Sequence, residues 1–203
     1  MSEIEYFYAA HSAYAYLGSR RFMEIAGAAG RRIVHRPVDL RRLVEAVGSQ
    51  PFRARSKAHV DYFFGREIAR WSEERNAPVL GHTPTHHAND ITLPNCFLIA
   101  GVEQGLNVDE LAHVLLEAHW KEDADLADLD TLTRLGQRAG IAPAPLLDAA
   151  LSEPILDLYE RYTQEAIDRS VFGSPTYVVD GDMFYGQDRL EMVERALRQP
   201  YSR

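Results

Sequence analysis

An α/β fold with a large all-helical insertion is predicted by three features of the 203-residue sequence. The first 38 residues follow the order strand, helix, strand, and the residues from Pro175 onward follow the order strand, strand, helix. Between these parts, residues 39–164 lose the strand pattern and become helical over a length too great for a loop. The length allows one domain, or one domain that carries an insertion.

The N-terminal part begins with a predicted strand at residues 4–8, where three side chains alternate with their neighbours: Ile4, Tyr6 and Tyr8. A helix is predicted over 14–29, because Ser12 is a good N-cap residue and Gly30 stands where a helix would end. Residues 32–36 form the second predicted strand, which Pro37 ends. Strand, helix and strand in this span predict a parallel pair joined by a right-handed crossover.

Helices are predicted throughout the middle of the chain. An amphipathic helix that ends before Pro78 carries an apolar stripe: Val60, Phe63, Phe64, Ile68 and Trp71. Another apolar helical face leads up to Trp120, and further helices fit residues 130–139, 143–152 and 153–167. We therefore expect a helical subdomain over 39–164, inserted into a domain made of residues 1–38 and 165–203.

The C-terminal part reads as a hairpin that opens with Pro175 and is followed by a helix. Residues 176–179 and 183–185 are the two strands, and Asp180-Gly181 is a dipeptide that favours a type I′ turn. Asp188 is placed to cap the closing helix, whose apolar residues recur at helical spacing: Leu190, Val193, Ala196 and Leu197. Proline, hairpin and helix in this order form the C-terminal half of a thioredoxin-like domain.

Composition argues against two classes of partner. A formal net charge of −8 and a pI near 5.5 leave no extended phosphate-binding face, so we expect neither nucleic acid nor an acidic membrane as partner. The N-terminus is acidic where a signal peptide would be basic, and no segment approaches ~20 apolar residues, which favours a soluble cytoplasmic protein. Cys96 is the only cysteine, so the chain has no internal disulfide and no C-x-x-C pair.

Three stretches resemble one enzyme family. They are Val-Phe-Gly-Ser-Pro-Thr at 171–176, Met-Phe-Tyr-Gly-Gln-Asp-Arg-Leu at 183–190, and the segment from Glu-Ala-His-Trp at 117–120 to Asp-Leu at 125–126. Together they resemble the 2-hydroxychromene-2-carboxylate isomerase family, which is related to kappa-class glutathione transferases and to DsbA-like oxidoreductases. The resemblance covers both the thioredoxin-like half and the insertion, and it implies glutathione as cofactor.

The resemblance implies a glutathione site at the C-terminal hairpin. Pro175 would be the cis residue, and the backbone of Ser174 would pair with the cysteinyl part of glutathione like an added strand. From the residues alone, an ordinary trans proline is the alternative, since only ~5–6% of X–Pro bonds in folded proteins are cis. Gln187 and Asp188 match the segment that holds the glutamyl end, where a carboxylate pairs with the α-amino group. Helix capping is their other possible role.

Ser12 is the candidate catalytic residue. A helix N-terminus carries unpaired N–H groups and partial positive charge, which can lower a thiol pKa from ~8.5 into the neutral range. The family has Ser-Pro-Tyr-x-Tyr-Leu here, with the serine contacting the glutathione sulfur, and this chain reads Ser-Ala-Tyr-Ala-Tyr-Leu at 12–17. Ala13 thus replaces the usual proline. The alternative is that Ser12 only caps its helix.

Glu45 is a departure from the family at the substrate end of the pocket. Counting from Arg36-Pro37, Glu45 occupies the place of a lysine that contacts the aromatic acid in the family. A substrate carboxylate would be repelled there unless nearby basic residues replace the lost charge: Arg41, Arg42, Arg53, Arg55 or Lys57. The identity of the substrate therefore stays open.

Two further features could have a chemical role: the histidine pair at 86–87 and the single cysteine, Cys96. His86-His87, with Asn89 and Asp90, resembles a metal cluster, but adjacent histidines in a strand point to opposite faces, which favours a polar loop near the cleft and no metal. Cys96 begins an apolar helix, so an inert buried thiol is favoured over a nucleophile.

The resulting expectation is a glutathione-dependent isomerase that acts on a small aromatic 2-oxo acid in aromatic degradation. A kappa-like glutathione transferase or peroxidase is one alternative, and a non-catalytic thiol-binding member of the fold is another, favoured if Tyr14 and Tyr16 block the thiol site. Because relatives are dimers, the resemblance also implies a homodimer.

Overall fold

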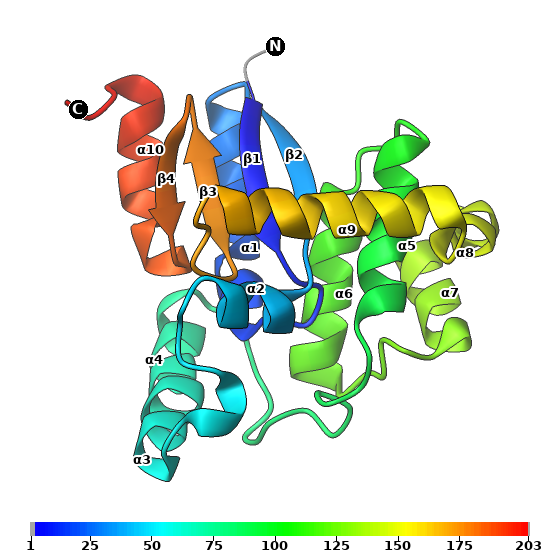
Figure 1. The fold of residues 1–203 in the computed structure, drawn as a ribbon, viewed down its shortest axis with the longest axis horizontal. Helices are drawn as coiled ribbons and strands as arrows, with labels where there is room; N and C mark the ends of the chain where they lie inside the picture. The colour runs from blue at the N-terminus through cyan, green and yellow to red at the C-terminus, as the bar shows by residue number, and fades with distance from the viewer. Residues whose placement is uncertain (1–2, 203) are drawn as a thin grey trace.

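The computed structural model describes residues 3–202, apart from the side chain of Arg53, and its centre is a mixed four-stranded sheet (Figure 1). The strands β1 (Glu3–Tyr8), β2 (Arg32–Pro37), β3 (Thr176–Val179) and β4 (Asp182–Tyr185) lie in the order β2-β1-β3-β4. β1 and β2 are parallel, and β3 is antiparallel to β1 and β4, which confirms the predicted pair and hairpin. Asp180 and Gly181 both have positive φ, as a type I′ turn requires.

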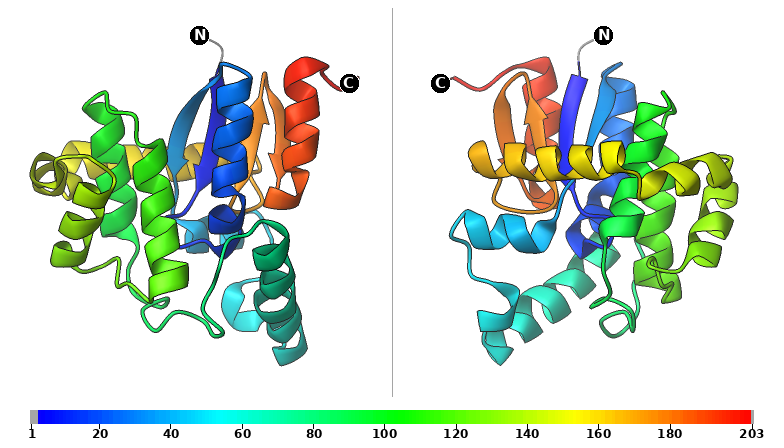
Figure 2. Two further views of the ribbon diagram at one scale, coloured as in Figure 1. Left: turned by 180° about the vertical axis from the view of Figure 1, so that it is seen from behind. Right: turned by 45° about the vertical axis from the view of Figure 1, so that its right-hand side comes forward.

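Helices cover both faces of the sheet. α1 (Ala13–Ala28) and α10 (Leu190–Arg198) lie on one face, and α9 (Glu153–Asp168) crosses the other (Figures 1 and 2). Beside the β2 edge lie the helices α5 (Thr92–Glu103), α6 (Asp109–Glu122), α7 (Leu129–Arg138) and α8 (Pro143–Ala150). No helix within residues 3–202 is long and apolar enough to cross a membrane.

One apolar core joins the thioredoxin-like part to the helices around it. It contains side chains from the sheet, from α1, from α5 and α6, and from α9. The predicted helices at 130–139, 143–152 and 153–167 are confirmed to within two residues at each end. The division of the chain at residues 38 and 164 stays a prediction.

An aromatic column fixes the carboxyl end of β1. Tyr6 stacks on Tyr8 with ring centroids 4.1 Å apart and on Tyr177 of β3 at 5.4 Å, and Phe22 of α1 packs on Tyr177 at 4.5 Å. These contacts arise because alternate residues of β1 face α1. The Tyr8 hydroxyl also hydrogen-bonds His35 Nδ1 of β2 at 2.8 Å. The chain therefore leaves β1 in a fixed direction.

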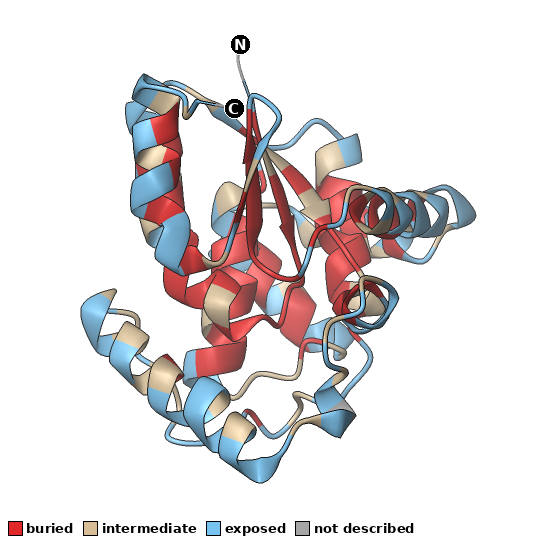
Figure 3. Ribbon diagram, turned by 60° about the vertical axis from the view of Figure 1, so that its left-hand side comes forward, coloured by how far each residue is buried: buried red, intermediate tan, exposed pale blue. Residues whose placement is uncertain are grey.

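A helical arm projects beyond the end of the sheet. After α2 (Leu40–Ala46) it comprises a 3-10 turn (Phe52–Ala54), α3 (Lys57–Val60), a π-helical segment (Asp61–Arg66) and α4 (Glu67–Glu74). Most of the arm is exposed, whereas the buried residues gather on the sheet and the helices that pack on it (Figure 3).

The predicted apolar stripe of the arm is wrong in one respect. Ile68 is buried and Phe64 and Trp71 pack against the core, but Val60 and Phe63 are exposed. The physical reason is the π-helical segment, whose wider turn breaks the 3.6-residue period on which the stripe was predicted. The same change directs Phe63 and Phe64 toward a cavity.

Asp188 does not cap α10, which corrects the prediction from sequence. Residues 187–189 form a 3-10 turn that continues directly into α10, and the N-cap position of α10 is Arg189, without a side-chain cap. Two amides at this junction find partners in the 3-10 turn, because Arg189 N donates to Gly186 O at 3.1 Å and Leu190 N donates to Gln187 O. The Asp188 carboxylate is therefore not needed for these two amides.

Candidate active site

The loop between β1 and α1 is held from the side by a buried amide. Asn95 of α5 is fully buried, and its Oδ1 accepts a hydrogen bond from Ala10 N at 2.9 Å. Its Nδ2 donates to Val38 O at 3.3 Å and to Tyr159 Oη at 3.1 Å. One side chain thus links the loop to the end of β2 and to α9.

Ser12 and Ser174 are neighbours in space at the end of this loop. The Ser12 hydroxyl donates to Ser174 O at 3.3 Å and accepts from Ala15 N at 3.3 Å, so that Ser12 is the N-cap of α1, as predicted. The Ser174 hydroxyl accepts from Ala9 N at 3.2 Å. The Ser174–Pro175 peptide bond is cis, as the resemblance implies. The start of α1 and the residue before the cis proline therefore share one corner.

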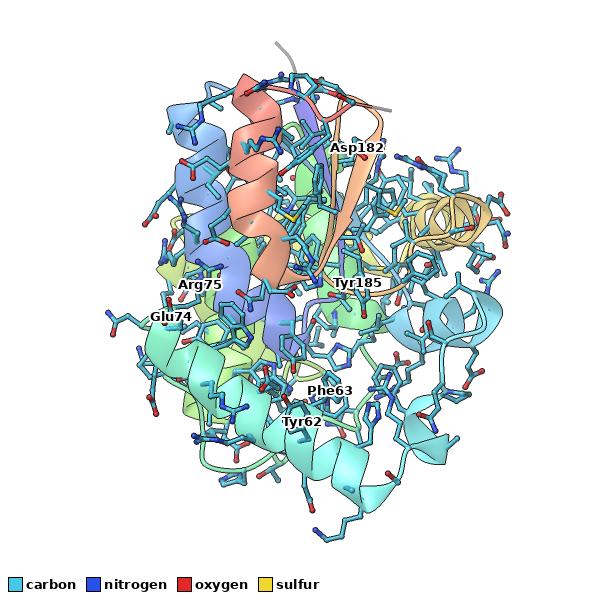
Figure 4. All side chains as sticks on the ribbon, turned by 90° about the vertical axis from the view of Figure 1, so that its left-hand side faces the viewer. Tyr62, Phe63, Glu74, Arg75, Asp182 and Tyr185 are labelled. Atoms are coloured by element: carbon cyan, nitrogen blue, oxygen red, sulfur yellow. The ribbon has the colours of Figure 1, made fainter. Side chains whose placement is uncertain are left out.

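A cavity of about 830 Å³ opens at this corner, between the end of the sheet, the arm and residues 83–88. Ser12 and Ser174 lie on its wall. Seven of the other lining residues are aromatic: Tyr14, Phe52, Phe63, Phe64, Trp120, Phe172 and Tyr185. Figure 4 shows Tyr185, at the end of β4, on the sheet side of the space and Phe63 on the arm side. A planar aromatic compound fits such walls by stacking.

Gln187 and Asp188 lie in the turn after β4 and do not line this cavity. Gln187 is buried, and its Oε1 accepts from Arg75 Nε at 3.0 Å. Arg75 also pairs with Glu191 at 2.7 Å, so it ties the end of α4 to the start of α10 (Figure 4). Gln187 is thus engaged in joining the arm to the domain, and the predicted contact of Gln187 and Asp188 with the glutamyl end of glutathione stays a prediction.

The two tyrosines of α1 that could block the thiol corner differ in position. Tyr14 lines the cavity and donates its hydroxyl to Phe63 O, which holds the arm over the space. Burial raises the pKa of Tyr14, and the negative charges of the Glu67 and Asp188 carboxylates add to the effect. Tyr16 faces away from the cavity and donates to Pro78 O at 2.9 Å. The cavity therefore stays open beside Ser12.

Charges of both signs line the outer part of the cavity. Glu45 is on the wall, as the count from Arg36-Pro37 implies, together with Arg41 and Arg55. Arg41 donates to three carbonyl oxygens of residues 87–89. Arg55 stacks its guanidinium on Phe52 and Phe64, with the guanidinium carbon 4.4 and 5.0 Å from the ring centroids. Within the described part of the chain, no carboxylate forms an ion pair with Arg55.

Arg42 and Lys57, which could also have replaced the lysine charge that is lost at Glu45, lie away from the cavity. Arg42 pairs with Glu160 and donates to Gln164 at 3.0 Å, and Lys57 pairs with Asp61 at 2.5 Å on the exposed arm. Neither lines the cavity. The side chain of Arg53 is outside the described part of the structure. Among the described side chains, Arg41 and Arg55 are thus the guanidinium groups on the cavity wall.

Three histidines that sequence reasoning did not bring together meet beside Ser12. The ring of His11 lies 4.8 Å from that of His87, both line the cavity, and His87 Nδ1 is 3.0 Å from Nε2 of His119. Burial, reinforced by the charges of neighbouring groups, lowers the pKa of His11 well below its ordinary value. The pKa of His87 falls to about 4, mainly because the ring is buried. The three histidines come from distant parts of the chain, so no local sequence pattern could predict that their rings are close together.

We expect the folded state to lose stability as pH falls from 7 to 4. His87 and His113 have folded pKa values of about 4, against about 6.5 when unfolded, so the unfolded chain binds more protons within this window. Each should contribute a loss of about 1 kcal/mol between pH 7 and pH 5, after allowance for solvent screening. Urea unfolding at the two pH values measures it. His87→Gln should reduce the loss, exposed His82→Gln should not, and an unchanged loss in His87→Gln would contradict the assignment.

Cys96 and the histidine pair at 86–87 offer no further chemistry. Cys96 is buried in α5, and burial raises its thiol pKa to about 12, which fits the expected inert thiol. Residues 82–90 form a loop without regular structure, as expected, and His86 lies 3.4 Å from the carboxylate of Asp125. Within residues 3–202, no group of three or more His, Cys, Asp or Glu side chains is arranged to hold a metal ion.

The arrangement of a thioredoxin-like sheet, a helix N-terminus and a cis proline defines a class of protein that the sequence confirms. Residues 3–198 match the family described as the DSBA-like thioredoxin domain, and the chain belongs to that family.

Relatives within this class point to one activity by name. The chain is 26% identical over 196 residues to the 2-hydroxychromene-2-carboxylate isomerase of Pseudomonas putida, covering 96% of this chain and 93% of that protein. It is 23% identical over 194 residues to the enzyme of the same name from Sphingobium xenophagum, covering 96% and 97%. A solved 2-hydroxychromene-2-carboxylate isomerase superposes with a TM-score of 0.80 at 26% identity, covering 97% of this chain and 94% of that one.

A more distant solved structure shares the fold alone. The cytosolic disulfide reductase DsbM from Pseudomonas aeruginosa, solved with GSH, superposes with a TM-score of 0.66 at 16% identity, covering 98% and 93% of the two chains.

Proposed function

We propose that the chain is a glutathione-dependent isomerase that acts on an aromatic 2-oxo acid, in the manner of the 2-hydroxychromene-2-carboxylate isomerases it resembles. One observation carries the proposal. The Ser12 hydroxyl and the main chain of Ser174 are 3.3 Å apart on the wall of an aromatic cavity, at the N-terminus of α1. Similarity over almost the full length of the named isomerases supports it.

The residues at this corner fit the thiol and the peptide of glutathione. The first turn of α1 has unpaired backbone N–H groups, which favour a thiolate over a thiol. The hydroxyl of Ser12 donates to Ser174 O at 3.3 Å, which is long for a bond between two oxygens. Turning this hydroxyl toward a thiolate therefore sacrifices little. It would also free the carbonyl of Ser174 to accept a hydrogen bond from a peptide.

The outer cavity fits an aromatic acid. The aromatic walls offer stacking surfaces, and a carboxylate can bind to the guanidinium groups of Arg41 and Arg55. Arg55 is held on the wall by its stacking on Phe52 and Phe64, while its charge has no carboxylate partner among the described residues. Arg55 is therefore the residue we assign to the substrate carboxylate, in place of the lysine that Glu45 replaces.

The chain's residues then divide the work of the reaction. Bound at Ser12 and Ser174, glutathione would supply a thiolate nucleophile, which would allow rotation about a substrate double bond by reversible addition to the conjugated carbon and would be regenerated on elimination. Ser12 and the N-terminus of α1 hold the sulfur charged and oriented. The aromatic walls and the overlying arm hold the planar part of the substrate in place. The arm, which the Tyr14 hydrogen bond fixes, also limits the access of water.

The test is conversion of 2-hydroxychromene-2-carboxylate with and without glutathione, followed by its absorbance, with free thiol measured over many turnovers. Conversion that requires glutathione and leaves the thiol concentration unchanged supports the proposal. Thiol loss in proportion to product would indicate a transferase instead. A rate equal to the rate without protein would refute the isomerase.

Changing the charge of Glu45 tests the substrate end separately. Glu45→Lys should lower the KM for the aromatic acid about three- to tenfold, because a repelling carboxylate becomes an attracting ammonium in a partly solvated place. The effect should weaken at high salt. Glu74→Lys makes the same charge change at an exposed position of α4 that does not line the cavity, and should leave KM unchanged (Figure 4). Equal effects of the two substitutions would place the carboxylate elsewhere.

A further inference from the structure

One buried polar ring on the wall of the cavity has no hydrogen-bond partner among the described residues. Five buried side-chain atoms have no hydrogen-bond partner within the described residues: Tyr6 Oη, His11 Nδ1, Arg36 Nε, Tyr177 Oη and Gln187 Nε2. Only His11 among these residues lines the cavity, where it directly precedes Ser12. A buried polar group without a partner costs about 1–3 kcal/mol. Nδ1 itself is closed off from the cavity, whereas Nε2 of His11 is neither among these buried atoms nor hydrogen-bonded within the described residues, so Nε2 is the nitrogen that a ligand in the cavity can reach.

The surroundings of His11 hold its ring in place. Trp120 donates its indole N–H to His11 O at 2.8 Å, which fixes the backbone. The residue is 6% exposed, and its ring lies 4.8 Å from the ring of His87, to which it is tilted by 33°. The imidazole therefore has little freedom to reorient, and it faces the cavity from a fixed position.

Those surroundings also keep the ring uncharged. His119 Nδ1 lies 3.0 Å from Ala124 O, and because a carbonyl only accepts, this nitrogen carries the proton. The neutral ring of His119 then accepts at Nε2 from Nδ1 of His87. The guanidinium of Arg41 lies on the same side and opposes a positive charge on His11, whose pKa is well below the ordinary value of histidine. At neutral pH, His11 is a neutral imidazole with one N–H donor and one acceptor.

We propose that His11 is a catalytic residue that donates a hydrogen bond from its neutral imidazole to the ketone oxygen of the 2-oxo acid. This inference rests on the proposed function and adds the group that polarises the substrate. When a nucleophile adds to the conjugated carbon, the electron pair of the double bond moves toward the ketone, and negative charge grows on its oxygen. The N–H of His11 stabilises that charge. The proton stays on nitrogen, so no further reactant is needed.

A neutral ring suits this task better than a charged one. An imidazolium beside the sulfur would pair with the thiolate and weaken it as a nucleophile, whereas a neutral donor responds mainly to the charge that develops on oxygen. Arg55 can hold the adjacent carboxylate on the same wall. The 2-oxo acid would then be bound at both of its oxygen groups.

The test uses three variants of the full chain. His11→Leu removes the donor, His11→Gln restores an N–H donor, and His113→Leu removes a buried histidine that does not line the cavity and instead hydrogen-bonds Ser19 at 2.7 Å. The first readout, without glutathione, is the infrared stretching frequency of the ¹³C-labelled ketone of bound benzylidenepyruvate. The second is kcat of the isomerisation with glutathione, and thermal unfolding shows that each variant is folded.

We expect a lowered ketone frequency in the wild-type protein and in His113→Leu, a frequency near that of the free compound in His11→Leu, and partial recovery in His11→Gln. The value of kcat should fall about tenfold in His11→Leu and recover in part in His11→Gln. A ketone frequency that is equal in wild type and folded His11→Leu would overturn the inference, and so would an unchanged kcat. If the wild-type protein is active but His11→Leu gives either of these two results, the His11 inference fails and the isomerase proposal stands. If the wild-type protein is inactive, the isomerase proposal and the His11 inference both fail.

Discussion

Replacing Ser12 with alanine is expected to lower kcat/KM about 10- to 100-fold and to raise the pKa of bound glutathione thiol by one to two units. A hydrogen bond to a charged group contributes about 1.5–3 kcal/mol, and the Ser12 hydroxyl would make one to the thiolate. The unpaired N–H groups of α1 remain, so part of the stabilisation persists. Steady-state kinetics and an ultraviolet titration of the bound thiolate measure the two quantities.

Two controls separate this effect from loss of the helix cap. Ser12→Ala should also cost about 1 kcal/mol of stability, since Ser12 caps α1, so activity is compared only where the variant is folded. Ser19→Ala removes another buried hydroxyl of α1 that lies off the cavity and bonds Tyr16 O and His113. It should leave the thiol pKa unchanged. A folded Ser12→Ala protein with a normal thiol pKa and rate would remove Ser12 from the mechanism.

Replacing Asn95 with leucine should lower the free energy of unfolding by about 3–5 kcal/mol, because three buried groups lose their partner at once. These are Ala10 N, Val38 O and Tyr159 Oη, and each unpaired buried group costs about 1–3 kcal/mol. Leucine has a similar volume, so packing alone changes little. Since Ala10 belongs to the loop before Ser12, activity should fall as well. Urea unfolding of the two proteins gives the difference.

The control for Asn95→Leu lies on the same helix. Gln104 at the end of α5 is exposed and donates one hydrogen bond to Pro145 O at 3.2 Å. Gln104→Leu should change stability by no more than about 0.5 kcal/mol. If Asn95→Leu were equally mild, the buried amide would not be the anchor of the loop.

The meeting of Ser12 with Ser174 was predictable because it follows from strand order and register. β1 and β3 pair antiparallel with Phe7 opposite Thr176, so the residues just after β1 and just before β3 must lie together. The serine N-cap and the proline before the hairpin can both be recognised from short stretches of the sequence. Fold class, the β1–β2 and β3–β4 pairings and most helices could be predicted from such local signals, whereas the antiparallel pairing of β1 with β3 was not predicted.

Other parts of the site could not be predicted from local patterns. The π-helical segment that turns Phe63 toward the cavity has no signal in the apolar spacing. The contact of His11 with His87 joins two different loops, 76 positions apart in the chain. Asp188 suited a helix cap, yet the amide of Leu190, the first residue of α10, is satisfied by the carbonyl of Gln187 in the preceding 3-10 turn. Each case depends on tertiary packing rather than on propensity.

A crystal structure of the protein with glutathione tests the central claim most directly. The account predicts the sulfur within hydrogen-bond distance of Ser12 Oγ and the cysteinyl main chain paired with that of Ser174, with the aromatic walls left free for substrate. Glutathione bound elsewhere, or a sulfur remote from the N-terminus of α1, would contradict it.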